Sequence, residues 1–204
     1  MRAHCGCWKR SLSETIETLR SQIAACTHCA KHLGAGPRPV VQFSGSARIL
    51  IIGQAPGSKV HATGVPWDDS SGERLREWTG IKPDDFYNAD KVALMPMGFC
   101  YPGKGKSGDL PPRKECAPLW HERILEHLPE DRLTLLVGSY AQVEFLPESK
   151  KQSLSHRVQN FSAHGTNIFP LPHPSWRVAG WMKKNPWFEA DVLPELKRAI
   201  SEKL

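Results

Sequence analysis

Two short apolar runs, each ending in a turn, constrain the fold of this chain more than any other feature. Residues 49–52 lead into Gly53-Gln54-Ala55-Pro56-Gly57, and residues 168–171 lead into Pro172-His173-Pro174-Ser175. A continuous aliphatic run such as 49–52 is typical of a strand that is covered on both faces of a parallel sheet. In open α/β sheets, ligands bind beyond the carboxyl ends of the strands. The two turns are therefore predicted to meet over one ligand.

Hydrophobic periodicity predicts alternating strands and helices along most of the chain. Strands are predicted at residues 48–52, 92–97, 133–137 and 167–171. Helices are predicted at residues 12–25, 71–79, 115–128, 139–147 and 187–204, and the first takes Ser11 or Ser13 as its N-cap. The Gly/Pro-rich segments 30–46 and 99–113 are predicted to lack regular structure. This order indicates an α/β fold, a three-layer α/β/α sandwich with a central, mainly parallel four-stranded sheet.

Composition favours one domain and a polyanionic partner. The 204 residues suit a single domain, 1–204, in which residues 1–10 form a flexible tail. The formal net charge is +6 and the pI is about 9.1, a moderate excess that favours a polyanionic partner such as nucleic acid; the alternative is a soluble protein that happens to be basic. No apolar run approaches the roughly 18 residues of a membrane helix, and residues 1–10 lack the apolar core of a signal peptide. We therefore expect a cytoplasmic monomer without a membrane partner.

Four of the six cysteines form two pairs. The pairs are Cys26 with Cys29, in a C-x2-C spacing, and Cys100 with Cys116, at the ends of a Gly/Pro-rich segment. Disulfides are not expected in the cytosol, whereas four thiolates suit zinc or an iron–sulfur cluster. The alternative for Cys100 and Cys116 is that they are ordinary buried thiols. Cys5 and Cys7 are interpreted as spare thiols.

In the order of its motifs, the chain resembles the uracil-DNA glycosylase superfamily. Residues 53–57 resemble the first signature motif, and residues 171–175 resemble the second. Gly64-Val65-Pro66-Trp67, followed by Gly72, resembles the segment that carries the base-stacking aromatic ring, and residues 185–189 resemble the start of the final helix. The spacing of the four paired cysteines resembles the [4Fe–4S] ligands of the iron–sulfur branches, similar to families 4 and 5. The resemblance covers residues 26 to about 196.

The resemblance implies a role for each site. The residues that bind the target base are Gly53, Gln54, Ala55, Pro56, Gly57 and Trp67. His173 donates to the base carbonyl that gains negative charge, and the loop Ser175-Trp176-Arg177 presses into the DNA. Lys104 and Lys106 are candidate phosphate contacts, although exposed lysines are most often only a solvated face. Cys26, Cys29, Cys100 and Cys116 hold a [4Fe–4S] cluster in this interpretation, and zinc is the alternative.

The chain departs from the family at three positions. Ala55 stands where the best-known branch has a water-activating aspartate, and Gln54 stands where the branch closest in spacing has glutamate. Pro96 stands at the position of that branch's uracil-reading asparagine, and Asn88, Asn160 or Asn167 could replace it.

A different carboxylate must then activate water. Asp69 is the first candidate and Asp68 the second, because a related branch carries an aspartate near this point. The alternative is that both only cap the helix that begins near residue 71.

Three functions are weighed on these grounds. The first is a monofunctional DNA glycosylase that flips and excises uracil or another deaminated base from DNA, as in base excision repair. The second is a non-catalytic protein of the same fold that binds DNA or a damaged base. The third is an electron-transfer protein with a fortuitous resemblance, which the basic charge and the His173 motif argue against.

Overall fold

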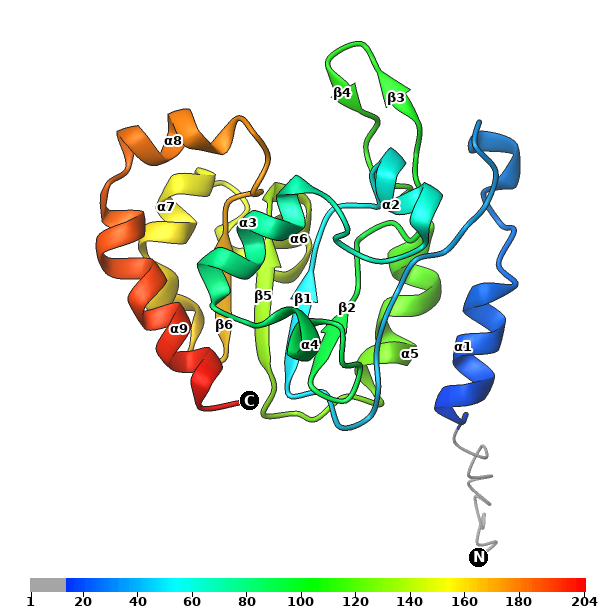
Figure 1. Ribbon diagram of the computed structural model, residues 1–204, viewed down its shortest axis with the longest axis horizontal. Coiled ribbons are helices and arrows are strands. Elements are labelled where there is room, and N and C mark those ends of the chain that lie inside the picture. The colour runs from blue at the N-terminus through cyan, green and yellow to red at the C-terminus, as the bar shows by residue number, and fades with distance from the viewer. Residues whose placement is uncertain (1–13) are drawn as a thin grey trace, which may run out of the picture.

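The computed structural model describes residues 14–204 and is built around a parallel four-stranded sheet (Figure 1). The strands are β1 (Ile49–Ile52), β2 (Val92–Leu94), β5 (Leu133–Val137) and β6 (Ile168–Leu171), in the order β2-β1-β5-β6. Ile51 of β1 pairs with Leu94 and Leu135, and Val137 of β5 pairs with Leu171. All four carboxyl ends therefore lie at one edge of the sheet. Pro170 is accommodated because β6 is an edge strand.

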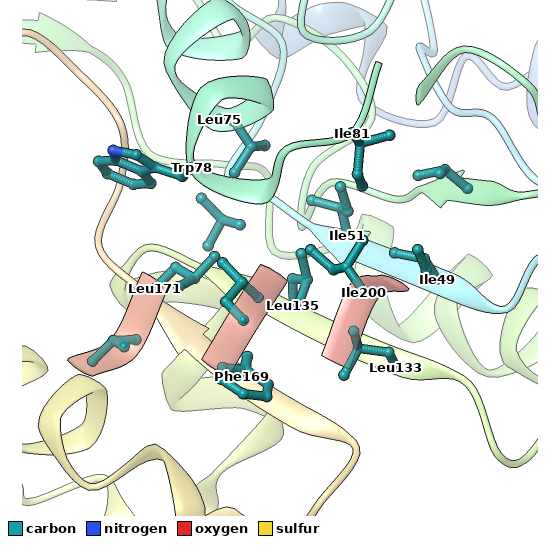
Figure 2. Close-up of a cluster of buried hydrophobic side chains, with 14 of the residues drawn as sticks. Ile49, Ile51, Leu75, Trp78, Ile81, Leu133, Leu135, Phe169, Leu171 and Ile200 are labelled. Carbon is teal, nitrogen blue, oxygen red and sulfur yellow. The ribbon is translucent and has the colours of Figure 1, made fainter. Parts of the chain in front are cut away.

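One face of the sheet is covered by five helices. They are α3 (Ser70–Thr79), α4 (Pro83–Phe86), α7 (Leu154–Gln159), α8 (Val178–Lys184) and α9 (Leu193–Ser201). Figure 2 shows Leu75 and Trp78 of α3 and Ile200 of α9 packed with strand residues such as Ile51 and Leu135. The buried stripes of α3 and α9 follow from apolar residues at helical spacing.

The other face carries α1 (Ile16–Ala24), α5 (Glu122–Leu125) and α6 (Ser139–Phe145). Leu19 and Ile23 of α1 pack with Leu50 and Ile52, whose side chains alternate with those of Ile49 and Ile51. Helices thus cover both faces, and the predicted three-layer α/β/α sandwich is confirmed. The four strands occur where the sequence predicts them, although β2 ends three residues earlier than expected.

Several element boundaries differ from the predictions. Helix α1 begins at Ile16 and is capped by Thr15, whose hydroxyl accepts from the Thr18 amide, so the prediction of a Ser11 or Ser13 cap is wrong. The predicted helices 115–128 and 187–204 each begin with a π-helical turn, Ala117–His121 and Phe188–Val192. The predicted tail at residues 1–10, with Cys5 and Cys7, lies outside the described residues.

The helices α2, α4, α7 and α8 were not predicted, and the prediction that segment 99–113 lacks regular structure is wrong. Helix α2 (Ser58–Thr63) follows the turn after β1, and the segment 99–113 contains a β-hairpin, β3 (Lys104–Gly105) with β4 (Gly108–Asp109). In Figure 1 the hairpin stands out from the body above α2. Each strand is only two residues long, which hydrophobic alternation cannot signal. Within residues 14–204, no helix is long and apolar enough to cross a membrane.

Candidate functional site

A cavity of about 520 Å³ opens at the carboxyl edge of the sheet. Its walls come from the turn after β1, the loop after β6 and the β3–β4 hairpin. The Gly53–Gly57 turn and His173 both line it, so the structure brings the two signature segments together. The loop after β6 also packs on the end of β5, because a Cβ on Gly138 would lie 3.4 Å from His173 Cβ.

Trp67 forms one wall of this pocket and has an unusual backbone. Its φ is 57°, the only positive value among the described non-glycine residues, and such a conformation persists only where the surroundings fix it. The guanidinium of Arg76 and the hydroxyl of Tyr87 donate to the Trp67 carbonyl at 3.4 and 3.5 Å. A side chain on Gly72 would collide with the same carbonyl. These contacts hold the indole ring toward the pocket.

The Trp67 ring lies between the first turn and the histidine. A Cβ on Gly53 would approach its Cζ2 to 2.6 Å, so only glycine allows the ring to rest on this backbone. The ring centroids of Trp67 and His173 are 6.1 Å apart and their planes are tilted by 33°. An aromatic face and an imidazole therefore border the same volume.

Burial in the pocket wall lowers the pKa of His173 below 6.5, and the charges of Asp69 and Asp109 oppose this effect only in part. The imidazole is therefore neutral at neutral pH, with an N–H that can donate a hydrogen bond. The loop around it is fixed by α3, because Arg74 Nη1 donates to the carbonyls of Pro174 and Ser175 at 3.1 and 2.9 Å.

The two candidate carboxylates differ in position. Asp69 is the N-cap of α3: its Oδ1 accepts from the Gly72 amide at 2.9 Å, while the residue also lines the pocket. Capping and a role in the site are thus compatible, since each uses a different oxygen. Asp68 is not among the pocket-lining residues and instead lies 3.6 Å from Lys59 Nζ.

Pro96 and Gln54 both line the pocket. The Pro96 carbonyl is joined to the buried His121 ring at 3.0 Å, which fixes this stretch of backbone. None of Asn88, Asn160 and Asn167 lines the pocket. Gln54 is therefore the amide side chain available at the pocket wall.

Of the five residues expected to contact DNA, three line the pocket and two lie on the β3–β4 hairpin: Ser175, Trp176 and Arg177, and Lys104 and Lys106. Ser175, Trp176 and Arg177 line the rim of the pocket, and the Trp176 side chain is 77% exposed. Arg177 lies 5.0 Å from the Trp176 ring centroid, and its Nη2 donates to the Ser107 carbonyl at 2.8 Å. Lys104 and Lys106 are exposed on the β3–β4 hairpin. A basic hairpin and an exposed aromatic ring therefore flank one opening.

The four paired cysteines gather between α1 and the segment after β2. Burial raises the pKa of Cys116 to about 11, and the charges of Cys29, Cys100 and Cys26 add to the shift. Burial also raises the pKa of Cys100 and of Cys29, and Arg113 opposes the shift at Cys29. In the part of the chain that the structure describes, no three His, Cys, Asp or Glu side chains are close enough to hold a single metal ion.

Sequence reasoning missed two residues at this site. Arg74 is a charged residue on an amphipathic helix, where charged residues are common. Only its hydrogen bond to Pro174, 100 residues away in the sequence, distinguishes it. Asp109 lines the pocket from the hairpin. No local pattern could have identified either, because both act through contacts distant in sequence.

Comparison with known proteins places these features in a family. The model of the uracil DNA glycosylase superfamily matches residues 40–197, a segment that contains both signature turns, Trp67 and the hairpin. A type-4 uracil-DNA glycosylase of Thermotoga maritima is 27% identical over 172 residues, covering 80% of this chain and 83% of that protein.

Proposed function

The chain belongs to the uracil-DNA glycosylase superfamily, and from that premise we propose that it is a DNA glycosylase. It hydrolyses the N-glycosidic bond of uracil or another deaminated base in DNA, the first step of base excision repair. One observation carries this proposal: the glycine turn, the indole of Trp67 and the neutral imidazole of His173 border one cavity at the carboxyl edge of the sheet. The alternative, a protein of this fold that binds DNA without cutting, is motivated by Ala55 and Pro96.

Each wall of the pocket has a task in base excision. A base inside a duplex is out of reach, so the enzyme must first extrude it, at a cost of a few kcal/mol. Stacking on Trp67 offsets about 1–3 kcal/mol of this cost. The backbone of residues 53–57 and the Gln54 amide bind the edge of the base.

Bond cleavage separates charge between the base and the sugar. The base leaves as an anion, and the His173 N–H stabilises the negative charge that develops on its carbonyl oxygen. A neutral imidazole donates this hydrogen bond without transferring its proton to the base. Asp69 presents its second oxygen to the pocket, where a carboxylate stabilises the sugar cation or accepts a proton from water.

The rim of the pocket receives the DNA. Trp176 inserts where the base has left the stack, and the Arg177 guanidinium lies beside it for the flanking phosphate. Lys104 and Lys106 contact the backbone from the hairpin, which positions the duplex without reading sequence.

Cys26, Cys29, Cys100 and Cys116 hold a [4Fe–4S] cluster in this proposal. The charges of Cys29, Cys100 and Cys26 all act on Cys116, which indicates that the four thiols lie near one another. Four thiolates suit either a cluster or zinc, and the resemblance of their spacing to the ligands of the iron–sulfur branches favours the cluster. Bound iron would replace the thiol protons and tie α1 to the segment that carries the hairpin.

The cluster is tested with Cys116→Ser and a matched Cys5→Ser control. Anaerobically purified Cys116→Ser is expected to lose bound iron and the visible absorption of a cluster, and to melt at lower temperature. Cys5→Ser should keep both. Stoichiometric zinc and no iron in the wild-type protein would refute the cluster.

The activity is tested with oligonucleotides that carry uracil, hypoxanthine or xanthine, followed by alkali to break abasic strands. Breaks at one of these bases are expected, and Trp67→Ala and His173→Ala should each reduce them sharply without unfolding the protein. Tight binding of every oligonucleotide with no abasic product, in protein shown to contain its metal centre, would favour the binding function instead.

A further inference from the structure

The β3–β4 hairpin brings a second carboxylate, Asp109, into the pocket. The hairpin is closed by the pairing of Lys104 with Asp109 and of Gly105 with Gly108. Gly108 has a φ of +140°, which sets the path of the chain just before Asp109 and disfavours any residue with a side chain.

The hairpin is closed at its base and is fixed to the body of the protein near its tip. The Leu110 amide donates to the Gly103 carbonyl at 2.8 Å, at its base. Arg177, from the loop that follows His173, donates to the Ser107 carbonyl at 2.8 Å, near its tip. The position of Asp109 is therefore coupled to the loop that carries the histidine.

One carboxylate oxygen of Asp109 is hydrogen-bonded within the protein, and the other is directed toward the Gly57 turn. Its Oδ1 accepts from the hydroxyl of the buried Tyr101 at 3.4 Å. A Cβ placed on Gly57 would lie 3.6 Å from Asp109 Oδ2 and 3.7 Å from Asp69 Oδ2. The free oxygens of the two aspartates thus flank the same point above the Gly57 backbone.

Asp69 and Asp109 have matching arrangements. Asp69 uses Oδ1 to cap α3 and directs Oδ2 to the Gly57 turn; Asp109 uses Oδ1 on Tyr101. Both charges also act on His173, so all three side chains share one volume. Gly57 has no side chain, which leaves the space between the two oxygens open to a small molecule.

We propose that Asp109 is a second catalytic carboxylate, which together with Asp69 holds and deprotonates the water that attacks the sugar. This inference rests on the proposed glycosylase activity and extends it. It also explains how a chain with Ala55 in its first motif retains a base for water: the carboxylate comes from the hairpin rather than from the turn.

The chemistry balances without any further reactant. The bond between the sugar carbon and the base nitrogen breaks, and its electron pair leaves with the base. The water oxygen forms a new bond to that carbon, and one water proton passes to an ionised aspartate. The second aspartate accepts a hydrogen bond from the same water and stabilises the positive charge on the sugar.

The test separates chemistry from binding. Single-turnover excision at saturating enzyme is measured for wild type, Asp109→Asn, Asp69→Asn and the double variant. Affinity is measured by anisotropy on a duplex with a 2′-fluoro nucleotide, which resists cleavage. The matched control is Asp84→Asn, the same substitution at an exposed carboxylate on α4 that does not line the pocket.

Asp109→Asn is expected to lower the single-turnover rate by about 100-fold, as for removal of a general base, with affinity and melting temperature unchanged. The double variant should be little slower than the slower single variant, because both residues act on one water. The Asp84→Asn control should keep both the saturating rate and the affinity.

A wild-type rate in Asp109→Asn, or a loss confined to affinity, would overturn the role of Asp109 while leaving the glycosylase intact. Fully multiplicative effects of the two aspartates would overturn the shared water. No cleavage by the wild-type protein would overturn the proposed function itself, and the inference with it.

Discussion

Gly53→Ala should damage the site through a single methyl group. A Cβ on Gly53 would lie 2.6 Å from Trp67 Cζ2, whereas carbon atoms in contact prefer about 3.5–4.0 Å. The indole must therefore move by about 1 Å. Its backbone cannot easily follow, because Arg76, Tyr87 and the close approach of Gly72 fix the Trp67 carbonyl.

Two measurable losses follow from this displacement. Overpacking of a fixed ring costs about 1–3 kcal/mol of stability, which lowers Tm by about 2–4 °C per kcal/mol in a chain of this length. A misplacement of about 1 Å in a catalytic site reduces the rate by up to about 100-fold. Single-turnover excision and thermal melting measure the two effects separately.

Gly180→Ala is the matched control for this substitution. Gly180 lies on α8, has open space around its Cβ position and has no left-handed φ, so alanine there should be neutral or stabilise the helix by about 0.5–1 kcal/mol. Trp67→Phe shortens the ring at the point of collision and should restore part of the activity and stability lost in Gly53→Ala. Wild-type rate and Tm in Gly53→Ala, or no rescue by Trp67→Phe, would refute the argument.

Two further predictions concern the histidine loop. Arg74→Ala removes two hydrogen bonds to the carbonyls beside His173 and should lower the single-turnover rate about 10-fold, which corresponds to about 1.4 kcal/mol. Glu77→Ala, at an exposed position on the same helix, should leave the rate unchanged. Equal rates in the two variants would count against a role for Arg74 in positioning the loop. By NMR, His173 should titrate below pH 6.5 in wild type and lower still in Asp109→Asn, because a charge that raises its pKa is lost. Since burial lowers the pKa of His173, its contribution to the free energy of unfolding is complete above pH 6.5 and declines as the pH falls toward the lowered pKa. If the His173 titration is the same in Asp109→Asn as in wild type, the Asp109 carboxylate does not lie near the imidazole.

The sequence by itself determined the layers of the fold and the edge at which the site lies. The aliphatic runs at β1 and β5 are long enough to require burial on both faces, and α3 presents Leu75 and Trp78 at helical spacing, so local pattern and tertiary structure agree there. Glycine and proline after β1 and β6 marked the two turns, because these residues end strands in recognisable ways.

Tertiary structure alone decided which side chains share the pocket. Asp68 and Asp69 are adjacent in sequence, yet only Asp69 lines the cavity, because the start of α3 directs its side chain there and leaves Asp68 beside Lys59. Asp109 and Arg74 belong to the site through contacts with residues that are distant in sequence: Gly57 is 52 positions from Asp109, and Pro174 is 100 positions from Arg74. Such contacts depend on how the hairpin and helices pack on the sheet, which is a property of the whole chain rather than of any local segment.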